Sequence, residues 1–153
     1  MNAAYIHITL NTIPPILNVT AFLILVVGLM RKNVSITRTA LVLMLAASIV
    51  GVPVYLSGEP AEHIVEKIEG VNAAAIEPHE EAGKWALIAF IVQGVVVLAT
   101  LIVATKRTVP QWLTIVVLLV ALWATSVVLR TAYLGGKIHH PETEMKQALG
   151  VRP

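Results

Sequence analysis

The stretch Ile76-Glu77-Pro78-His79-Glu80-Glu81-Ala82-Gly83-Lys84-Trp85 stands directly before a long apolar run and predicts the start of a membrane-spanning helix. Proline suits the first turn of a helix, where its missing N–H leaves no hydrogen bond unmade. The three glutamates lie where the positive end of the helix dipole favours carboxylates. His79 then points along the side that the apolar residues bury. We therefore expect this stretch to form one wall of a cofactor or metal site at a membrane surface.

The composition around this stretch is that of a membrane protein. Of the 153 residues, 57% are hydrophobic and 13% are charged, whereas a soluble domain carries about 25% charged residues. At about 20 apolar residues per span, the four long apolar runs use most of the chain. They predict an all-α, integral-membrane, four-helix up-down bundle over residues 1–137, followed by a polar tail over 138–153. The spans are expected at about 6–30, 37–56, 78–104 and 110–134, with a short surface helix over 61–68.

Composition also excludes several function classes. The net charge is only +2 and the basic residues are scattered, so nothing predicts nucleic-acid binding. The absence of cysteine excludes disulfides, thiolate zinc sites, iron–sulfur clusters and covalently attached haem. No nucleophile motif or glycine-rich phosphate loop occurs. An electron-transfer or accessory subunit is therefore a better expectation than a stand-alone enzyme.

The short loops predict the orientation of the chain. Basic residues gather at the first and third connections, at Arg31, Lys32, Arg38, Lys106 and Arg107. Cytoplasmic loops carry such an excess of Lys and Arg. Both termini and the connection from Gly58 to Glu77 should then face outward, into the periplasm if the membrane is a bacterial inner membrane. All nine acidic residues and all five histidines fall on this outer side.

Residues that share a helix face predict the inward stripes of the bundle, because successive residues rotate by about 100°. Small or polar side chains recur on one face of each span, and Pro14-Pro15 should bend the first span. The stripes are His7, Asn11, Pro14 and Asn18 in the first span; Ala40, Met44, Ala47, Ser48 and Gly51 in the second; His79, Gly83, Ala86, Phe90, Gln93 and Val97 in the third; and Ser126, Arg130, Tyr133 and Lys137 in the fourth.

Two histidines are expected to face one another across the outer half of the bundle. In an up-down bundle the first and third helices are diagonal, which places His7 opposite His79. This arrangement suits one non-covalent haem b with two imidazole ligands. The remaining members of the predicted site are Asn11 and Gly83 as lining, Arg130 and Lys84 as partners of the propionates, and His139 or His140 as a substitute ligand. A periplasmic cytochrome or a larger respiratory complex would be the partner.

Two other functions compete with haem binding. The chain offers N and O ligands suited to a divalent transition metal, namely His7, His79 and His140, with Glu80 and His63 as further candidates. Alternatively, the chain is a non-catalytic scaffold, and each histidine is an ordinary interfacial or solvated residue. The pattern leaves open whether the chain forms a homo-oligomer.

Three stretches resemble a family of small four-span bacterial inner-membrane proteins of largely unknown function. These are Tyr55–Glu62 (YLSGEPAE), Ile76–Ala82 (IEPHEEA) and Thr131–Glu142 (TAYLGGKIHHPE), where Gly135-Gly136 is expected to end the fourth helix. The resemblance implies a periplasmic-side cluster around His7, His79 and His140, but no activity. The chain is also loosely similar to four-helix b-type cytochromes, although its histidines lie on one side of the membrane only.

Overall fold

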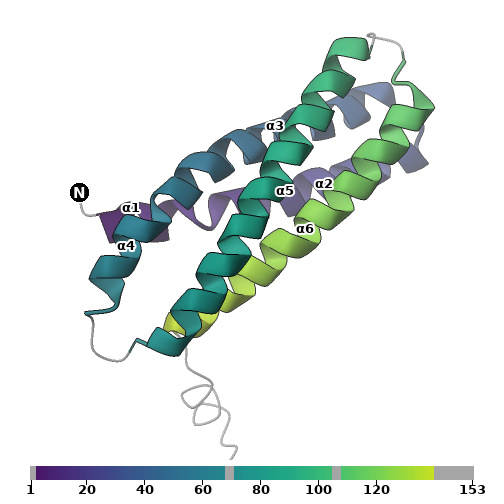
Figure 1. The fold of residues 1–153 in the computed structure, drawn as a ribbon. Helices are drawn as coiled ribbons and strands as arrows, with labels where there is room; N and C mark the ends of the chain where they lie inside the picture. The colour runs from purple at the N-terminus through teal and green to yellow at the C-terminus, as the bar shows by residue number, and fades with distance from the viewer. Residues whose placement is uncertain (1–2, 68–70, 105–107, 140–153) are drawn as a thin grey trace, which may run out of the picture.

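The computed structural model describes residues 3–67, 71–104 and 108–139, and it is all-α over these residues (Figure 1). Their elements are α1 (Ala3–Leu10), α2 (Ile13–Met30), α3 (Val34–Leu56), α4 (Gly58–Val65), the short 3₁₀-helix η1 (Ala73–Ala75), α5 (Ile76–Val103) and α6 (Gln111–His139). Four segments are long and apolar enough to cross a membrane: His7–Met30, Val34–Leu56, Ala73–Val103 and Gln111–Ile138. The predicted all-α bundle of four spans is therefore confirmed, and its apolar helices indicate a lipid environment.

The long helices run up and down in a bundle (Figure 1). Helix α2 packs against α3 and α6, and α5 packs against the same two helices. Helices α2 and α5 therefore lie diagonally, as the up-down arrangement predicts. The short helices α1, α4 and η1 gather at one end, which also carries His7 and His79. We refer to it as the histidine end.

The first span is broken rather than continuous. Helix α1 ends at Leu10, and α2 begins at Ile13 with Pro14 and Pro15 in its first turn. These prolines have no N–H to continue the α1 ladder, so the chain restarts there and α1 leans against α4. The predicted bend is thus confirmed.

Helix α6 passes through Gly135-Gly136 and ends only at His139. The prediction that this pair ends the helix is wrong. In an apolar environment every backbone N–H and C=O needs a partner, and a continuous helix supplies them even though glycine costs about 1 kcal/mol relative to alanine. The surface helix is also shifted, since α4 covers Gly58–Val65 instead of 61–68.

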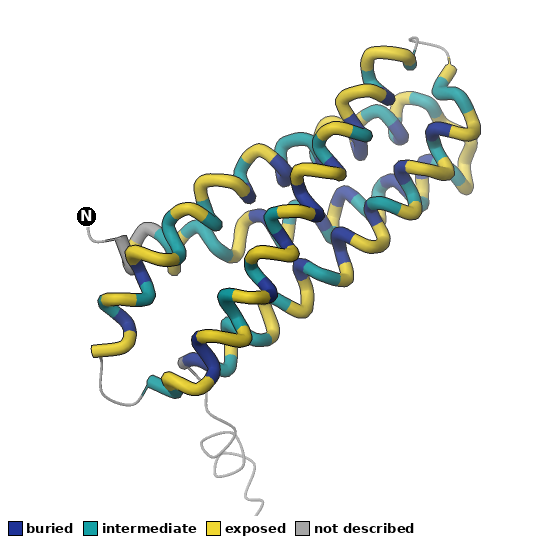
Figure 2. Tube along the Cα trace, viewed as in Figure 1, coloured by how far each residue is buried: buried dark blue, intermediate teal, exposed yellow. Residues whose placement is uncertain are grey.

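Buried positions follow the predicted stripes on three of the four long helices (Figure 2). The buried members are Pro14 and Asn18 on α2, Ala40, Met44, Ala47, Ser48 and Gly51 on α3, and Ala86, Phe90, Gln93 and Val97 on α5. The stripe predicted for the fourth span is wrong, because Ser126, Arg130 and Tyr133 are exposed. Helix α6 instead buries Val117, Ala121, Ala124 and Val128. Small apolar residues allow close helix approach. On α6 they, and not the polar residues, decide which face is buried.

Candidate two-histidine cavity

A cavity of about 590 Å³ lies at the histidine end of the bundle. Residues of α1, α2, α3 and α4 line one side of it, and residues of α5 and α6 line the other. Its floor is apolar and includes Gly51, Phe90 and Val128, while both His7 and His79 line its walls. This volume is within the range of about 300–1,000 Å³ typical of small-molecule sites.

His7 is fixed in orientation by the end of α3. Its Nδ1 lies 3.1 Å from the Val54 carbonyl oxygen and 3.0 Å from Ser57 Oγ, which itself donates to the Val54 oxygen at 2.8 Å. The carbonyl is available because the last carbonyls of a helix have no partner within that helix. Since a carbonyl only accepts, Nδ1 carries the hydrogen in this contact, and Nε2 then bears a lone pair.

His79 is fixed in the same way by α6. Its Nδ1 lies 3.0 Å from the Thr131 carbonyl oxygen, and the Thr131 hydroxyl, 3.0 Å from the Ala82 carbonyl oxygen, connects α6 back to α5. The imidazole packs directly on Gly135, where an added Cβ would lie 2.8 Å from Cε1. The Gly135 position therefore makes room for the ring. The sequence analysis did not predict this role. The available clue was a glycine on the fourth span at the depth of a histidine on the third, because a ring packed between two helices needs a residue without a side chain beside it.

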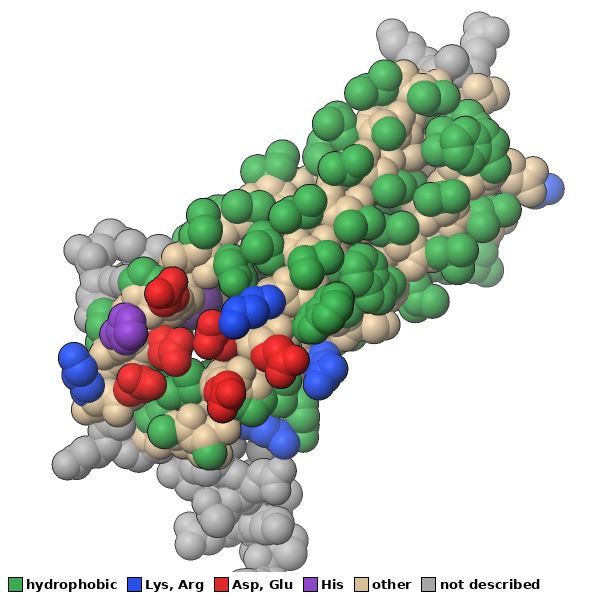
Figure 3. Space-filling model, in the orientation of Figure 1, with side chains coloured by type: hydrophobic (Ala, Val, Ile, Leu, Met, Phe, Trp, Pro, Cys, Tyr) green, Lys and Arg blue, Asp and Glu red, His purple; other side chains and the backbone are tan. Residues whose placement is uncertain are grey.

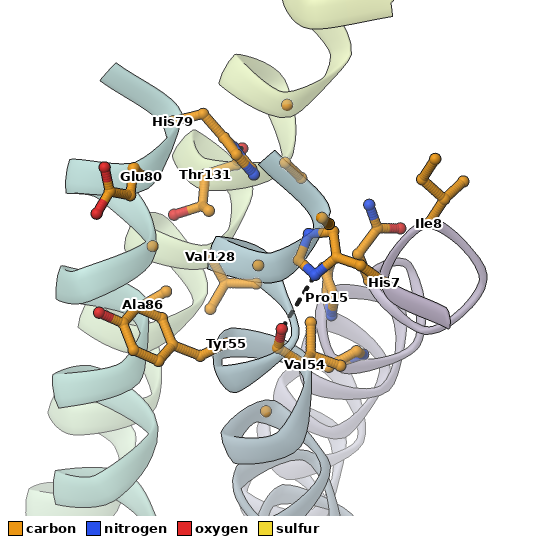
Figure 4. A pocket seen from close by; sticks show the side chains of 18 of the residues that line it. His7, Ile8, Pro15, Val54, Tyr55, His79, Glu80, Ala86, Val128 and Thr131 are labelled. Atoms are coloured by element: carbon orange, nitrogen blue, oxygen red, sulfur yellow. Dashed lines mark hydrogen bonds between the residues drawn. The ribbon is translucent and has the colours of Figure 1, made fainter. Parts of the chain in front are cut away.

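The two imidazoles reach into the same space from opposite sides (Figure 4). Neither Nε2 has a hydrogen-bond partner among the residues that the structure describes. Metal-ligating histidines almost always donate their other ring N–H to a backbone carbonyl, a carboxylate or water. His7 and His79 both have this arrangement, so each offers an Nε2 lone pair to an occupant of the cavity.

Carboxylates border the cavity on the α4 side and at the start of α5. Glu59, Glu62 and Glu80 are among its lining residues, whereas no Lys or Arg of the described ranges is. Burial, and then repulsion from Glu80, raises the pKa of Glu62 above its usual value. In Figure 3 the glutamates gather over this end, and hydrophobic side chains cover most of the remaining face. The cavity therefore has an apolar interior and an acidic rim.

The structure separates the other predicted site residues into two groups. Asn11, Gly83 and Glu80 line the cavity with the two histidines. Arg130, Lys84 and His63 are exposed and do not line it, and Lys84 forms an ion pair with Glu80 at 3.1 Å. The His139 side chain and all of His140 lie outside the described residues.

The grouping of ligands bears on the metal alternative. Within residues 3–67, 71–104 and 108–139, no three His, Asp or Glu side chains come together in a way that would hold a metal ion. The proposed divalent-metal site is thus unsupported by the part of the chain that the structure describes. A haem iron, in contrast, takes its other four ligands from the porphyrin and needs only two imidazoles from the protein.

Comparisons with family models, with curated proteins and with solved structures each find no match to this chain.

Proposed function

We propose that this chain is a membrane-embedded b-type haem protein, acting as an electron-transfer protein or a respiratory-complex subunit, with His7 and His79 as the axial ligands. The observation that carries the proposal is the pair of imidazoles that enter one cavity from diagonal helices with Nδ1 anchored and Nε2 unpartnered. When bound, haem supplies one-electron chemistry. The chain would hold the two imidazoles in place and exclude water with an apolar floor.

The residues fit the iron better than they fit the periphery of the porphyrin. Two anchored imidazoles and the small Gly83 on the lining suit a flat ring between α1 and α5, and Gly135 leaves room for the imidazole of His79. Among the residues that the structure describes, no Lys or Arg lines the cavity to meet the propionates, so Arg130 and Lys84 would have to reach them from outside it. The basic turns predict that both termini face outward, and the resemblance to bacterial inner-membrane proteins implies that this side is the periplasm. The site would then lie within reach of a periplasmic cytochrome.

An absorption spectrum of protein expressed with a sufficient supply of haem tests this function. A Soret band that disappears in both His7→Ala and His79→Ala is expected. His63→Ala is the matched control, because His63 is exposed on α4 and does not line the cavity. A colourless wild-type protein, or a band that persists in both site variants, would contradict the haem proposal.

A second candidate function is the binding of a neutral lipid-soluble ring such as a quinone. Two observations favour it. The first is that three glutamates line the cavity and no Lys or Arg from the described part of the chain does, which suits a neutral ligand better than an anionic one. Ile16 and Leu56 also line the cavity although each is 66% exposed. In a bundle surrounded by lipid, these two side chains would place an opening of the cavity toward the hydrocarbon.

Extraction of the purified protein distinguishes the two occupants. Under the second function, mass spectrometry of the organic extract should show about one quinone per chain in the wild type and a loss in His7→Ala. An extract with haem and no quinone would rule this function out. An extract with quinone and no haem would instead rule out the first.

A further inference from the structure

A cluster of four buried polar side chains lies one helical turn beyond the floor of the two-histidine cavity. Its members come from all four long helices: Asn18 on α2, Ser48 on α3, Gln93 on α5 and Thr125 on α6. We call it the polar node. Gln93 Nε2 lies 2.7 Å from Asn18 Oδ1, 3.2 Å from Ser48 Oγ and 3.3 Å from the Met44 carbonyl oxygen. Asn18 Nδ2 donates to Thr125 Oγ1 at 3.0 Å.

The node has one polar atom without a partner. Gln93 is fully buried, and its Oε1 receives no hydrogen bond from any residue that the structure describes. Turning the amide by 180° would place its oxygen against Asn18 Oδ1 and the Met44 carbonyl oxygen, which are both acceptors, so these contacts favour the present orientation. A buried polar group left unpaired costs about 1–3 kcal/mol. The position therefore calls for a partner that the protein does not supply.

Water has the donor that Gln93 Oε1 lacks, and the floor of the two-histidine cavity lies about one helical turn away. The hydrocarbon core of a bilayer holds no water to satisfy buried groups. On the side of the node away from the histidines, the helices meet through a buried apolar cluster that includes Leu25, Leu41 and Val97. On the other side lie Phe90 and Gly51 of the cavity floor. Phe90 precedes Gln93 by three positions on α5, and Gly51 follows Ser48 by three positions on α3.

Phe90 packs closely at the cavity floor. Its ring lies so close to Gly51 that a Cβ added there would come within 2.4 Å of Phe90 Cδ2. The ring thus packs against α3 at the cavity floor, three positions along α5 from the node residue Gln93.

We propose that a water molecule, supplied from the two-histidine cavity past Phe90, binds at Gln93 Oε1. The hydroxyls of Ser48 and Thr125, which belong to the same node, are its candidate further partners, since a buried water typically makes about three hydrogen bonds. Water from the histidine end then reaches the middle of α5, and the apolar cluster stops it there.

Solid-state NMR of the wild-type protein in bilayers tests the proposal, with magnetisation transferred from water to ¹³C-labelled side chains. Gln93 Cδ should receive magnetisation at a rate that approaches that of the exposed Gln111, and much faster than the buried Leu25. Transfer to Gln93 as slow as transfer to Leu25 would overturn the site.

A second measurement tests the route. Phe90→Leu leaves less bulk beside Gly51, so the side-chain amide protons of Gln93 should exchange with solvent several-fold faster than in the wild type. Phe22→Leu is the matched control, because Phe22 packs against the apolar cluster and does not line the cavity. An unchanged exchange rate in Phe90→Leu, or an equal gain in Phe22→Leu, would overturn supply from the cavity.

Discussion

On the side of Gln93 away from the histidines, the long helices meet through small and branched side chains, whereas on the histidine side they enclose a cavity. In the first half the helices approach closely. Gly28 on α2 lies against the backbone of Thr37 on α3, and a Cβ added at Gly28 would lie 2.8 Å from the Thr37 nitrogen. The second half is opened by the break between α1 and α2 and by the short helices α4 and η1. Packing and chemistry are therefore separated along the bundle axis.

The difference shows what holds each half together. In lipid, helices associate through van der Waals packing and interhelical hydrogen bonds. The hydrophobic effect does not drive this step, because hydrocarbon surrounds the helices both before and after they associate. The close-packed half relies on packing. The histidine end relies on the His7–Val54 and His79–Thr131 hydrogen bonds, which also orient the imidazoles. We expect changes in the first half to affect stability and changes in the second to affect binding.

The largest expected effect comes from removing packed volume. Leu25 is fully buried in the close-packed half, and Leu25→Ala should lower the free energy of unfolding by about 2–5 kcal/mol. Ile16→Ala, at a residue 66% exposed beside the cavity, is expected to cost much less. Unfolding in mixed micelles measures both. Equal losses would show that the two halves are packed alike.

A glycine pair offers the sharpest test of binding at the histidine end. Gly135→Ala places a methyl group 2.8 Å from His79 Cε1, whereas a Cβ at Gly136 meets nothing within 4 Å. Changes that disturb the support of a ligand typically cost 10–100-fold in affinity. We expect Gly135→Ala to weaken the proposed haem binding by that factor, measured by haem titration, and Gly136→Ala, which also lines the cavity but displaces no protein atom, to weaken it less. A similar loss in both variants would mean that replacing either glycine of α6 weakens binding, and that contact of the methyl group with the His79 imidazole is not the cause.

Much of this architecture was predictable from sequence, for physical reasons that particular residues illustrate. The spans follow from apolar length, and the stripe from His79 to Val97 follows from helical rotation, so His7 and His79 could be placed opposite one another. The stripe on α6 was not predictable from polar residues, because Arg130 and Tyr133 lie in the last third of that helix, at the histidine end, and are exposed there. The Gly135 position was interpreted as a helix breaker, since its true role depends on a ring from another helix.

The polar node should contribute a smaller stability effect than Leu25. Hydrogen bonds between transmembrane helices contribute about 0.6 kcal/mol on average, and up to about 1.7. A double-mutant cycle with Asn18→Leu and Thr125→Val isolates the 3.0 Å contact between these two side chains, and we expect a coupling energy in that range. A coupling energy of zero would mean that the Asn18–Thr125 contact does not stabilise the protein, which would leave the contacts of Gln93 as the stabilising part of the node.

The smallest effect is the pH dependence that the acidic rim confers. The pKa of Glu62 in the folded protein is raised above its ordinary value of 4.5, first by burial and then by repulsion from Glu80. The folded state therefore binds this proton more tightly than the unfolded state does. Its stabilising contribution is complete below pH 4.5 and is lost as the pH rises through the folded pKa. Glu62→Gln removes the proton exchange, so the slope of Tm against pH should flatten above pH 4.5. Glu81→Gln is the control, because Glu81 is exposed on α5, does not line the cavity and is not among the groups that shift the pKa of Glu62. A slope that flattens equally in the control would trace the pH dependence to the net charge of this end instead of the cavity rim.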